Sequence, residues 1–164
     1  MEIRGKVVKY GDNVNTDVII PGKFLVLTDP RELAVHAMEG LDPEFPRKVK
    51  EREVVVAGKN FGCGSSREQA PIALKYAGVR CIVADSFARI FYRNAINIGL
   101  PVVECDGIGA KVRDGDELMV NPGIGLVEDV SAGLKVKAIP IPGFLLEIME
   151  KGLVEYIKAR RMDK

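Results

Sequence analysis

The sequence contains no tryptophan and only one histidine, His36, so histidine-based catalysis or metal binding has a single candidate residue. The three cysteines, Cys63, Cys81 and Cys105, are odd in number and widely spaced. This pattern argues against a disulfide framework, and iron–sulfur sites usually show at least one close cysteine pair. We therefore expect this chain to bind no metal and no cofactor, and we interpret Cys81 and Cys105 as small residues buried in strands.

The sequence also lacks long apolar runs and a marked excess of either positive or negative charge. No run approaches the roughly 20 apolar residues that span a bilayer, and residues 1–6 lack a signal-peptide pattern. Lysine and arginine number 24 and aspartate and glutamate 23, so a net charge of +1 gives no bulk attraction to nucleic acid or anionic membranes. We expect a cytoplasmic protein with one domain, residues 1–164, and a substantial core.

Apolar runs and helical periodicity alternate through the first two thirds of the chain, which predicts an α/β fold with parallel strands. The last third has turns between short β runs, which predicts an antiparallel unit followed by two helices. Residues 41–53, with two prolines and many charges, are expected to form a solvated loop. The expected strands are 3–10, 54–57, 80–84, 102–105, 117–120, 126–130 and 134–139, and the main helices are 30–39, one ending near 76, 87–98, one around 144–149, and 153–161.

A glycine- and serine-rich turn at residues 60–70 is the most informative segment. Gly62 and Gly64 allow backbone conformations that other residues avoid, and Ser65, Ser66 and Arg67 follow at the expected start of a helix. A helix N-terminus attracts anions, and a guanidinium can bind a carboxylate through two parallel hydrogen bonds. The segment therefore predicts an anion site with a hydroxyl group beside it.

The same segment has a purely structural interpretation. Ser65 and Glu68 have the spacing of a capping box, in which the serine would only cap a helix. A cap requires neither the preceding glycines nor Arg67, so we favour the anion site. The turn lacks the third glycine of a dinucleotide fingerprint and the Gly-Lys-Ser/Thr of a Walker loop, so neither of these nucleotide-binding motifs is present.

Three motifs resemble the small subunit of the 3-isopropylmalate dehydratase family, which is similar to the swivelling domain of aconitase. The motifs are Asp12-x-x-x-Thr16-Asp17-x-Ile19-x-Pro21, Asn60-Phe-Gly-Cys-Gly-Ser-Ser-Arg-Glu68 and Ser86-Phe-Ala-Arg-Ile-Phe-Tyr-Arg-Asn-Ala-Ile-Asn97. The resemblance covers nearly the whole chain and implies a swivelling β/β/α fold, with helices against a mixed sheet. Homoaconitase small subunits are close relatives.

The resemblance also implies an activity and a partner. The reaction would be a dehydration and rehydration that moves a hydroxyl group between neighbouring carbons of a malate-type acid, here in leucine biosynthesis. Ser65 would be the catalytic base, Ser66 would add a hydrogen bond, and Arg67 would bind a carboxylate of this di- or tricarboxylic hydroxy acid. A separate large subunit would carry a [4Fe–4S] cluster on three cysteines. The sequence leaves open whether the isolated small subunit is a monomer or a homo-oligomer.

A second apolar segment is a candidate for substrate specificity. Phe24, Leu25, Val26 and Leu27 correspond to a segment that lies near the variable end of the substrate in related subunits. Homoaconitase-like versions resemble Tyr-Leu-Arg-Thr, whose arginine can pair with an extra carboxylate. Val26 replaces that arginine, which favours isopropylmalate over homoaconitate. The alternative is that these four residues are core.

Other interpretations stay open at this stage. One alternative is a homoaconitase small subunit of a lysine or coenzyme B type pathway. Another is a noncatalytic anion-binding module, and a third is a free-standing hydrolase that uses Ser65, although the Gly-x-Ser-x-Gly elbow is absent. A second substrate arginine has no assigned position. We interpret Arg89, Arg93, Asn94 and Asn97 as structural support, or as a face for the large subunit.

Overall fold

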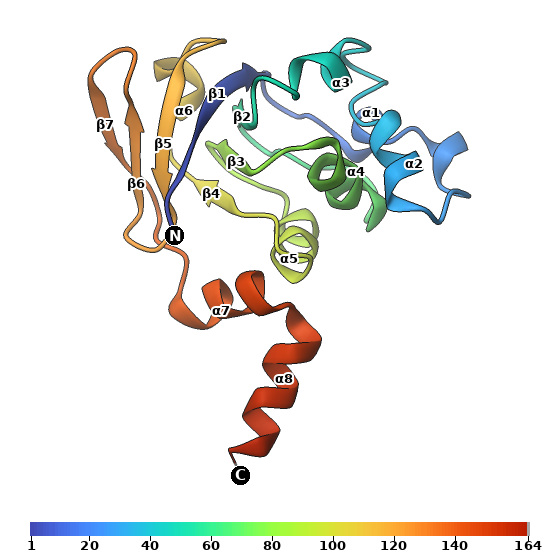
Figure 1. Cartoon of the computed structure of the whole chain (residues 1–164). Helices are drawn as coiled ribbons and strands as arrows, with labels where there is room; N and C mark the ends of the chain where they lie inside the picture. Colours follow the sequence, from blue (N-terminus) through green and yellow to red (C-terminus); the bar gives the residue numbers. More distant parts are fainter. Residues whose placement is uncertain (164) are drawn as a thin grey trace.

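The computed structural model describes residues 1–163 and contains a mixed seven-stranded sheet with helices packed against it (Figure 1). The strand order is β4-β3-β2-β1-β5-β6-β7, parallel from β4 to β1 and antiparallel from β1 to β7. This confirms the expected mixed-sheet α/β fold. The strands are β1 (Ile3–Lys9), β2 (Val54–Ala57), β3 (Cys81–Ala84), β4 (Val102–Glu104), β5 (Glu117–Asn121), β6 (Leu126–Asp129) and β7 (Leu134–Lys137).

The helices are α1 (Thr16–Ile19), α2 (Pro30–Val35), α3 (Phe45–Lys48), α4 (Gln69–Ala77), α5 (Arg89–Asn97), α6 (Ile108–Lys111), α7 (Gly143–Lys151) and α8 (Leu153–Met162), with a short 3-10 turn, η1, at Gly22–Phe24. Helix α2 packs on α4, and α4 and α5 lie beside each other on the parallel side of the sheet (Figure 1). Helix α7 contacts α5, and α8 extends away from the rest of the molecule. Among residues 1–163, no helix has the length and apolar composition needed to cross a membrane.

Burial explains why the two halves of the sheet differ. Every residue of β2 and β3 is buried, as expected for parallel strands that are covered on both faces. Strands β5 and β6 instead alternate buried and half-buried residues, which is typical of antiparallel strands with one face toward the core. The parallel strands predicted from apolar runs and the antiparallel unit predicted from turns between short β runs are both confirmed.

Two expectations about the segment between β1 and β2 are wrong. The helix that begins at Pro30 ends at Val35 rather than near Gly40, because the Met38 N–H donates to the carbonyl of Ile19 at 2.7 Å and draws the chain toward α1. Asp29 caps that helix, because its Oδ1 accepts a hydrogen bond from the Arg31 N–H at 2.9 Å. The expected solvated loop at 41–53 contains α3, which forms because Phe45 is fully buried in the core.

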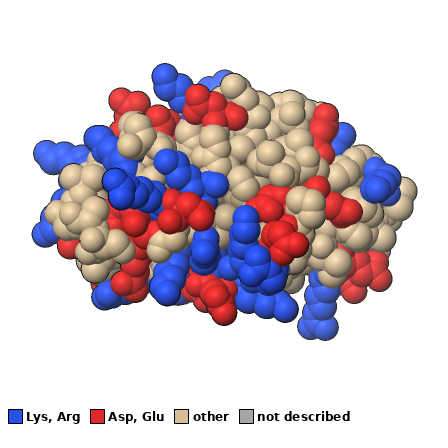
Figure 2. All heavy atoms as spheres, turned by 90° about the horizontal axis from the view of Figure 1, so that it is seen from above, with Lys and Arg blue, Asp and Glu red and all other residues tan. Residues whose placement is uncertain are grey.

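Surface charge is mixed on the face that Figure 2 displays. Lysine and arginine side chains alternate with aspartate and glutamate, and neither sign forms a continuous field on this face. Ion pairs contribute to this mixing, for example Arg4 with Glu117 at 3.1 Å and Arg52 with Asp114 at 2.9 Å. This face therefore lacks the extended basic stripe that binds a nucleic-acid backbone.

Candidate active site

The three sequence motifs meet at the carboxyl ends of the parallel strands β1, β2 and β3. The Thr16 N–H donates to the carbonyl of Cys63 at 2.8 Å, which joins the first motif to the glycine–serine turn. The Phe61 N–H donates to the carbonyl of Ser86 at 3.0 Å, which joins that turn to the third motif. Ligands of open α/β sheets bind at this edge, because loops from several strands converge there.

The turn after β2 depends on its glycines. Gly62 and Gly64 have φ values of +82° and +97°, a region that side chains with a Cβ avoid. A Cβ on Gly62 would lie 2.2 Å from Cγ of Phe91, so only glycine lets α5 approach the turn this closely. Phe91 in turn packs edge-on against Phe61, with 5.3 Å between ring centroids. Helix α5 and the turn are therefore held together as one unit.

Ser65 does not cap a helix in this structure. Helix α4 begins at Gln69, and its N-cap residue, Glu68, makes no side-chain cap hydrogen bond. The expectation that the helix starts at the serines is thus wrong, because the chain makes a further tight turn, in which the Arg67 N–H donates to the carbonyl of Ser65 at 2.9 Å. The capping-box interpretation is wrong for the same reason.

Thr16 holds Ser65 in place. The Thr16 hydroxyl donates to the carbonyl oxygen of Ser65 at 2.8 Å, and its Oγ1 lies 3.4 Å from Oγ of Ser65. Thr16 is itself 2 % exposed, so the contact is anchored in the core. Sequence reasoning found Thr16 as part of a motif but gave it no role, since the contact joins segments 49 residues apart.

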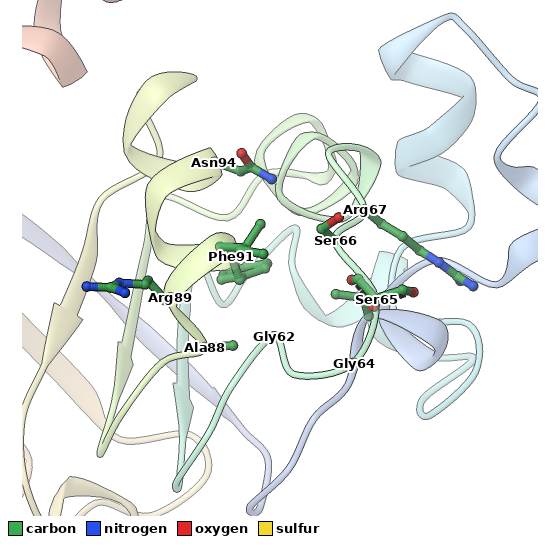
Figure 3. A pocket seen from close by; sticks show the side chains of 11 residues that line it. Gly62, Gly64, Ser65, Ser66, Arg67, Ala88, Arg89, Phe91 and Asn94 are labelled. Atoms are coloured by element: carbon green, nitrogen blue, oxygen red, sulfur yellow. Dashed lines mark hydrogen bonds between the residues drawn. The ribbon is translucent and has the colours of Figure 1, made fainter.

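Arg67 bridges the turn to the segment around α1. Its Nη1 donates to the carbonyl of Ile20 at 2.8 Å, and its Nη2 lies 2.7 Å from Oδ1 of Asp17. The guanidinium points away from Ser65 in Figure 3, and the side chain is only 18 % exposed. The sequence did not predict this intramolecular carboxylate partner for Arg67.

The segment Phe24–Leu27 does not line the cavity beside Ser65. Val26 is 82 % exposed, so the core interpretation is wrong for this residue. Phe24, Leu25 and Leu27 are half-buried against the core. Phe24 also stacks on His36, with 3.7 Å between ring centroids. The segment follows Ile20, which accepts the bond from Arg67, and so lies close in sequence to the site.

A cavity of about 260 Å³ lies between the glycine–serine turn and α5 (Figure 3). Its α1 and turn residues are Thr16, Gly62, Gly64, Ser65, Ser66 and Arg67, and its third-motif residues are Ala88, Arg89, Ile90, Phe91 and Asn94. Ser65, Ser66 and Arg67, to which the sequence assigned an anion site, all line this cavity. The structure also places Arg89 and Asn94 at the cavity, where sequence reasoning had favoured structural support.

The cysteines do not converge on this cavity. Cys81 and Cys105 are fully buried, as predicted, and burial raises the pKa of the Cys81 thiol to about 12 and that of Cys105 to about 11. Cys63 is half-buried in the turn. Within residues 1–163, no three histidine, cysteine, aspartate or glutamate side chains are grouped so that they could hold a metal ion.

The fold and this cavity define a protein of the aconitase class. The family model described as the aconitase C-terminal domain matches residues 29–106. The chain is 57% identical over 157 residues to 3-isopropylmalate dehydratase small subunit 1 of Methanopyrus kandleri, which covers 95% of this chain and 92% of the relative. It is 54% identical over 162 residues to the isopropylmalate/citramalate isomerase small subunit of Methanocaldococcus jannaschii, with coverage of 98% and 96%.

A solved structure supports the same assignment. The crystal structure of 3-isopropylmalate dehydratase from Methanocaldococcus jannaschii superposes with a TM-score of 0.91 at 48% sequence identity, over 99% of this chain and 96% of that one. The chain therefore belongs to the family of 3-isopropylmalate dehydratase small subunits. The expected swivelling-domain fold of the aconitase type is confirmed.

Proposed function

We propose that this chain is the small subunit of a hydro-lyase that interconverts 2-isopropylmalate and 3-isopropylmalate in leucine biosynthesis. The observation that carries the proposal is similarity over nearly the full length to such small subunits, in a chain whose cavity is lined by Ser65, Ser66 and Arg67. We further propose that residues 1–164 act as one domain, in the cytoplasm, and only together with a large subunit.

Ser65 acts as the base that removes the carbon-bound proton in this proposal. A free serine hydroxyl is a very weak base, so its alkoxide needs hydrogen-bond donors. The peptide N–H groups of Ser65 and Ser66 make no backbone hydrogen bond within residues 1–163, which leaves them available for this purpose. The Oγ1 of Thr16, 3.4 Å away, can orient the hydroxyl before the proton is transferred.

Arg67 binds a substrate carboxylate in this proposal. A guanidinium carries five N–H donors, and within residues 1–163 that of Arg67 makes two bonds, to Ile20 and Asp17. The remaining N–H groups can donate to a substrate carboxylate, while Asp17 and Ile20 hold the arginine close to the turn. Ser66 lies beside it on the cavity wall and adds a hydroxyl donor.

The iron–sulfur cluster belongs to the large subunit in this proposal, on three cysteines of that partner. The cysteines of the small subunit do not fit a cluster, because Cys81 and Cys105 are sealed in the core and their raised pKa values oppose formation of the thiolate. The small subunit thus contributes the base and the carboxylate-binding residues, and it does so from the edge of its sheet.

Val26 favours isopropylmalate over homoaconitate, because an exposed apolar side chain in this segment offers no partner for a third carboxylate. The relative from Methanocaldococcus jannaschii is named for both isopropylmalate and citramalate, so a citramalate-type acid is the second candidate substrate. The two acids differ in the size of the apolar group and not in charge. A homoaconitase small subunit and a noncatalytic anion-binding module are less favoured.

Reconstitution with the large subunit tests the proposal. The two chains are combined anaerobically with a rebuilt cluster, and isopropylmalate, citraconate and homoaconitate are offered in parallel. We expect turnover of isopropylmalate by the wild type and loss of turnover in Ser65→Ala. Preference for homoaconitate would overturn the hypothesis that Val26 selects isopropylmalate. Full activity of Ser65→Ala would overturn the hypothesis that Ser65 is the catalytic base.

A further inference from the structure

The side-chain amide of Asn94 faces the cavity and has no hydrogen-bond partner among residues 1–163. It projects from α5 toward the wall formed by Ser66 (Figure 3). The amide of Asn60, by comparison, donates to Oδ1 of Asn13 at 3.2 Å, whereas Asn94 makes no side-chain hydrogen bond within residues 1–163. Asn94 is half-buried, and its amide nitrogen points toward Ser66 in Figure 3, so its two N–H donors are available as binding groups.

The position of Asn94 is fixed by its neighbours on α5. Phe91, three residues earlier and on the same helix face, is 3 % exposed and packs directly over Gly62. Ala95, the next residue, is fully buried and anchors the helix from its other side. The packing of α5 therefore fixes the position of the Asn94 amide opposite the serines, as a binding residue requires.

We propose that Asn94 is a substrate-binding residue, whose amide N–H donates to a carboxylate oxygen of the hydroxy acid in this cavity. The inference rests on the proposed function and adds a binding residue on the opposite side of the same cavity. Ser65, Ser66 and Arg67 hold the substrate from the turn, and Asn94 holds it from α5. A neutral amide also suits a site next to Arg67, because it adds a donor without adding repulsion between cations.

Steady-state kinetics of the reconstituted enzyme test the inference, with Asn94→Ala, Asn94→Asp and the matched control Asn97→Ala. Asn97 lies on the same helix but lines a separate hollow with Tyr92 and Leu145. We expect the KM for isopropylmalate to rise about tenfold or more in Asn94→Ala, because a hydrogen bond to a charged group is lost. Asn94→Asp should raise the KM further, since the new carboxylate would then repel the carboxylate of the substrate.

The pattern of kcat and KM separates binding from folding. We expect kcat to stay within about threefold in the Asn94 variants and both constants to be unchanged in Asn97→Ala. Asn94→Asp conserves the volume of the side chain, so thermal melting of the free chain should match that of the wild type. An unchanged KM in Asn94→Asp, or an equal rise in Asn97→Ala, would overturn the inference. Absence of turnover by the wild-type pair would instead overturn the proposed function.

Discussion

Gly62→Ala should destabilise the free chain far more than an ordinary glycine substitution. The new Cβ would lie 2.2 Å from Cγ and 2.4 Å from Cβ of Phe91, which is well inside van der Waals contact. Phe91 cannot yield easily, because it is 3 % exposed and packs against Phe61 on one side and Phe87 on the other. The substitution therefore separates α5 from the glycine–serine turn or strains both.

Two contributions set the magnitude. A residue with a Cβ in the left-handed region costs about 1–2 kcal/mol. Overpacking of a well-filled core adds about 1–3 kcal/mol. The expected loss for Gly62→Ala is thus about 2–5 kcal/mol, which corresponds to a fall in Tm of roughly 4–20 °C for a chain of this size.

Urea denaturation and thermal melting of the free chain measure this loss, and Gly133→Ala provides the control. Gly133 has a similar φ of +67°, but nothing lies within 4 Å of the position of its Cβ. It should therefore show only the conformational cost of about 1–2 kcal/mol. Equal losses of stability in Gly62→Ala and Gly133→Ala would refute the claim that close packing of Phe91 shapes this site.

Two further predictions concern the hairpin at the sheet edge and the exposed segment beside the site. Asp129→Asn should raise the free energy of unfolding at about pH 8 and lose this advantage near pH 3, because burial and then Asp116 raise the pKa of Asp129. Because the folded-state pKa is raised, the stability that Asp129 contributes is full below its unfolded pKa and is lost as the pH rises through the folded pKa. A difference in unfolding free energy between Asp129→Asn and the wild type that stays the same from about pH 3 to about pH 8 in urea titrations would contradict this prediction. Val26→Arg should change the free energy of unfolding by less than about 0.5 kcal/mol, because Val26 is 82 % exposed. The same variant should lower isopropylmalate turnover relative to homoaconitate in the reconstituted enzyme, and unchanged isopropylmalate turnover would exclude this segment as the selector.

Local signals along the chain predicted most of the fold. Helices were expected to end near residue 76 and at residue 98, and the glycines that follow these points, Gly78 and Gly99, have positive φ values. The parallel strands were visible as short apolar runs, because strands covered on both faces need apolar side chains at every position. The error at α3 has a physical reason as well, since charges and prolines suggested a loop while burial of Phe45 decided the outcome.

What the sequence by itself determined is the chemistry of the site: the glycine-rich turn, the two serines and the arginine, and the motifs around them. Only the tertiary structure decided which of these residues meet. Thr16 contacts Ser65 across 49 residues, Arg67 reaches Ile20 across 47, and Asn94 on α5 faces Ser66 in the turn. These contacts follow from the parallel pairing of β1, β2 and β3, which brings distant loops to one edge of the sheet. The alternation of strands and helices predicted parallel strands, but it gave neither their order in the sheet nor the loop residues that meet, because both depend on how the whole core is packed.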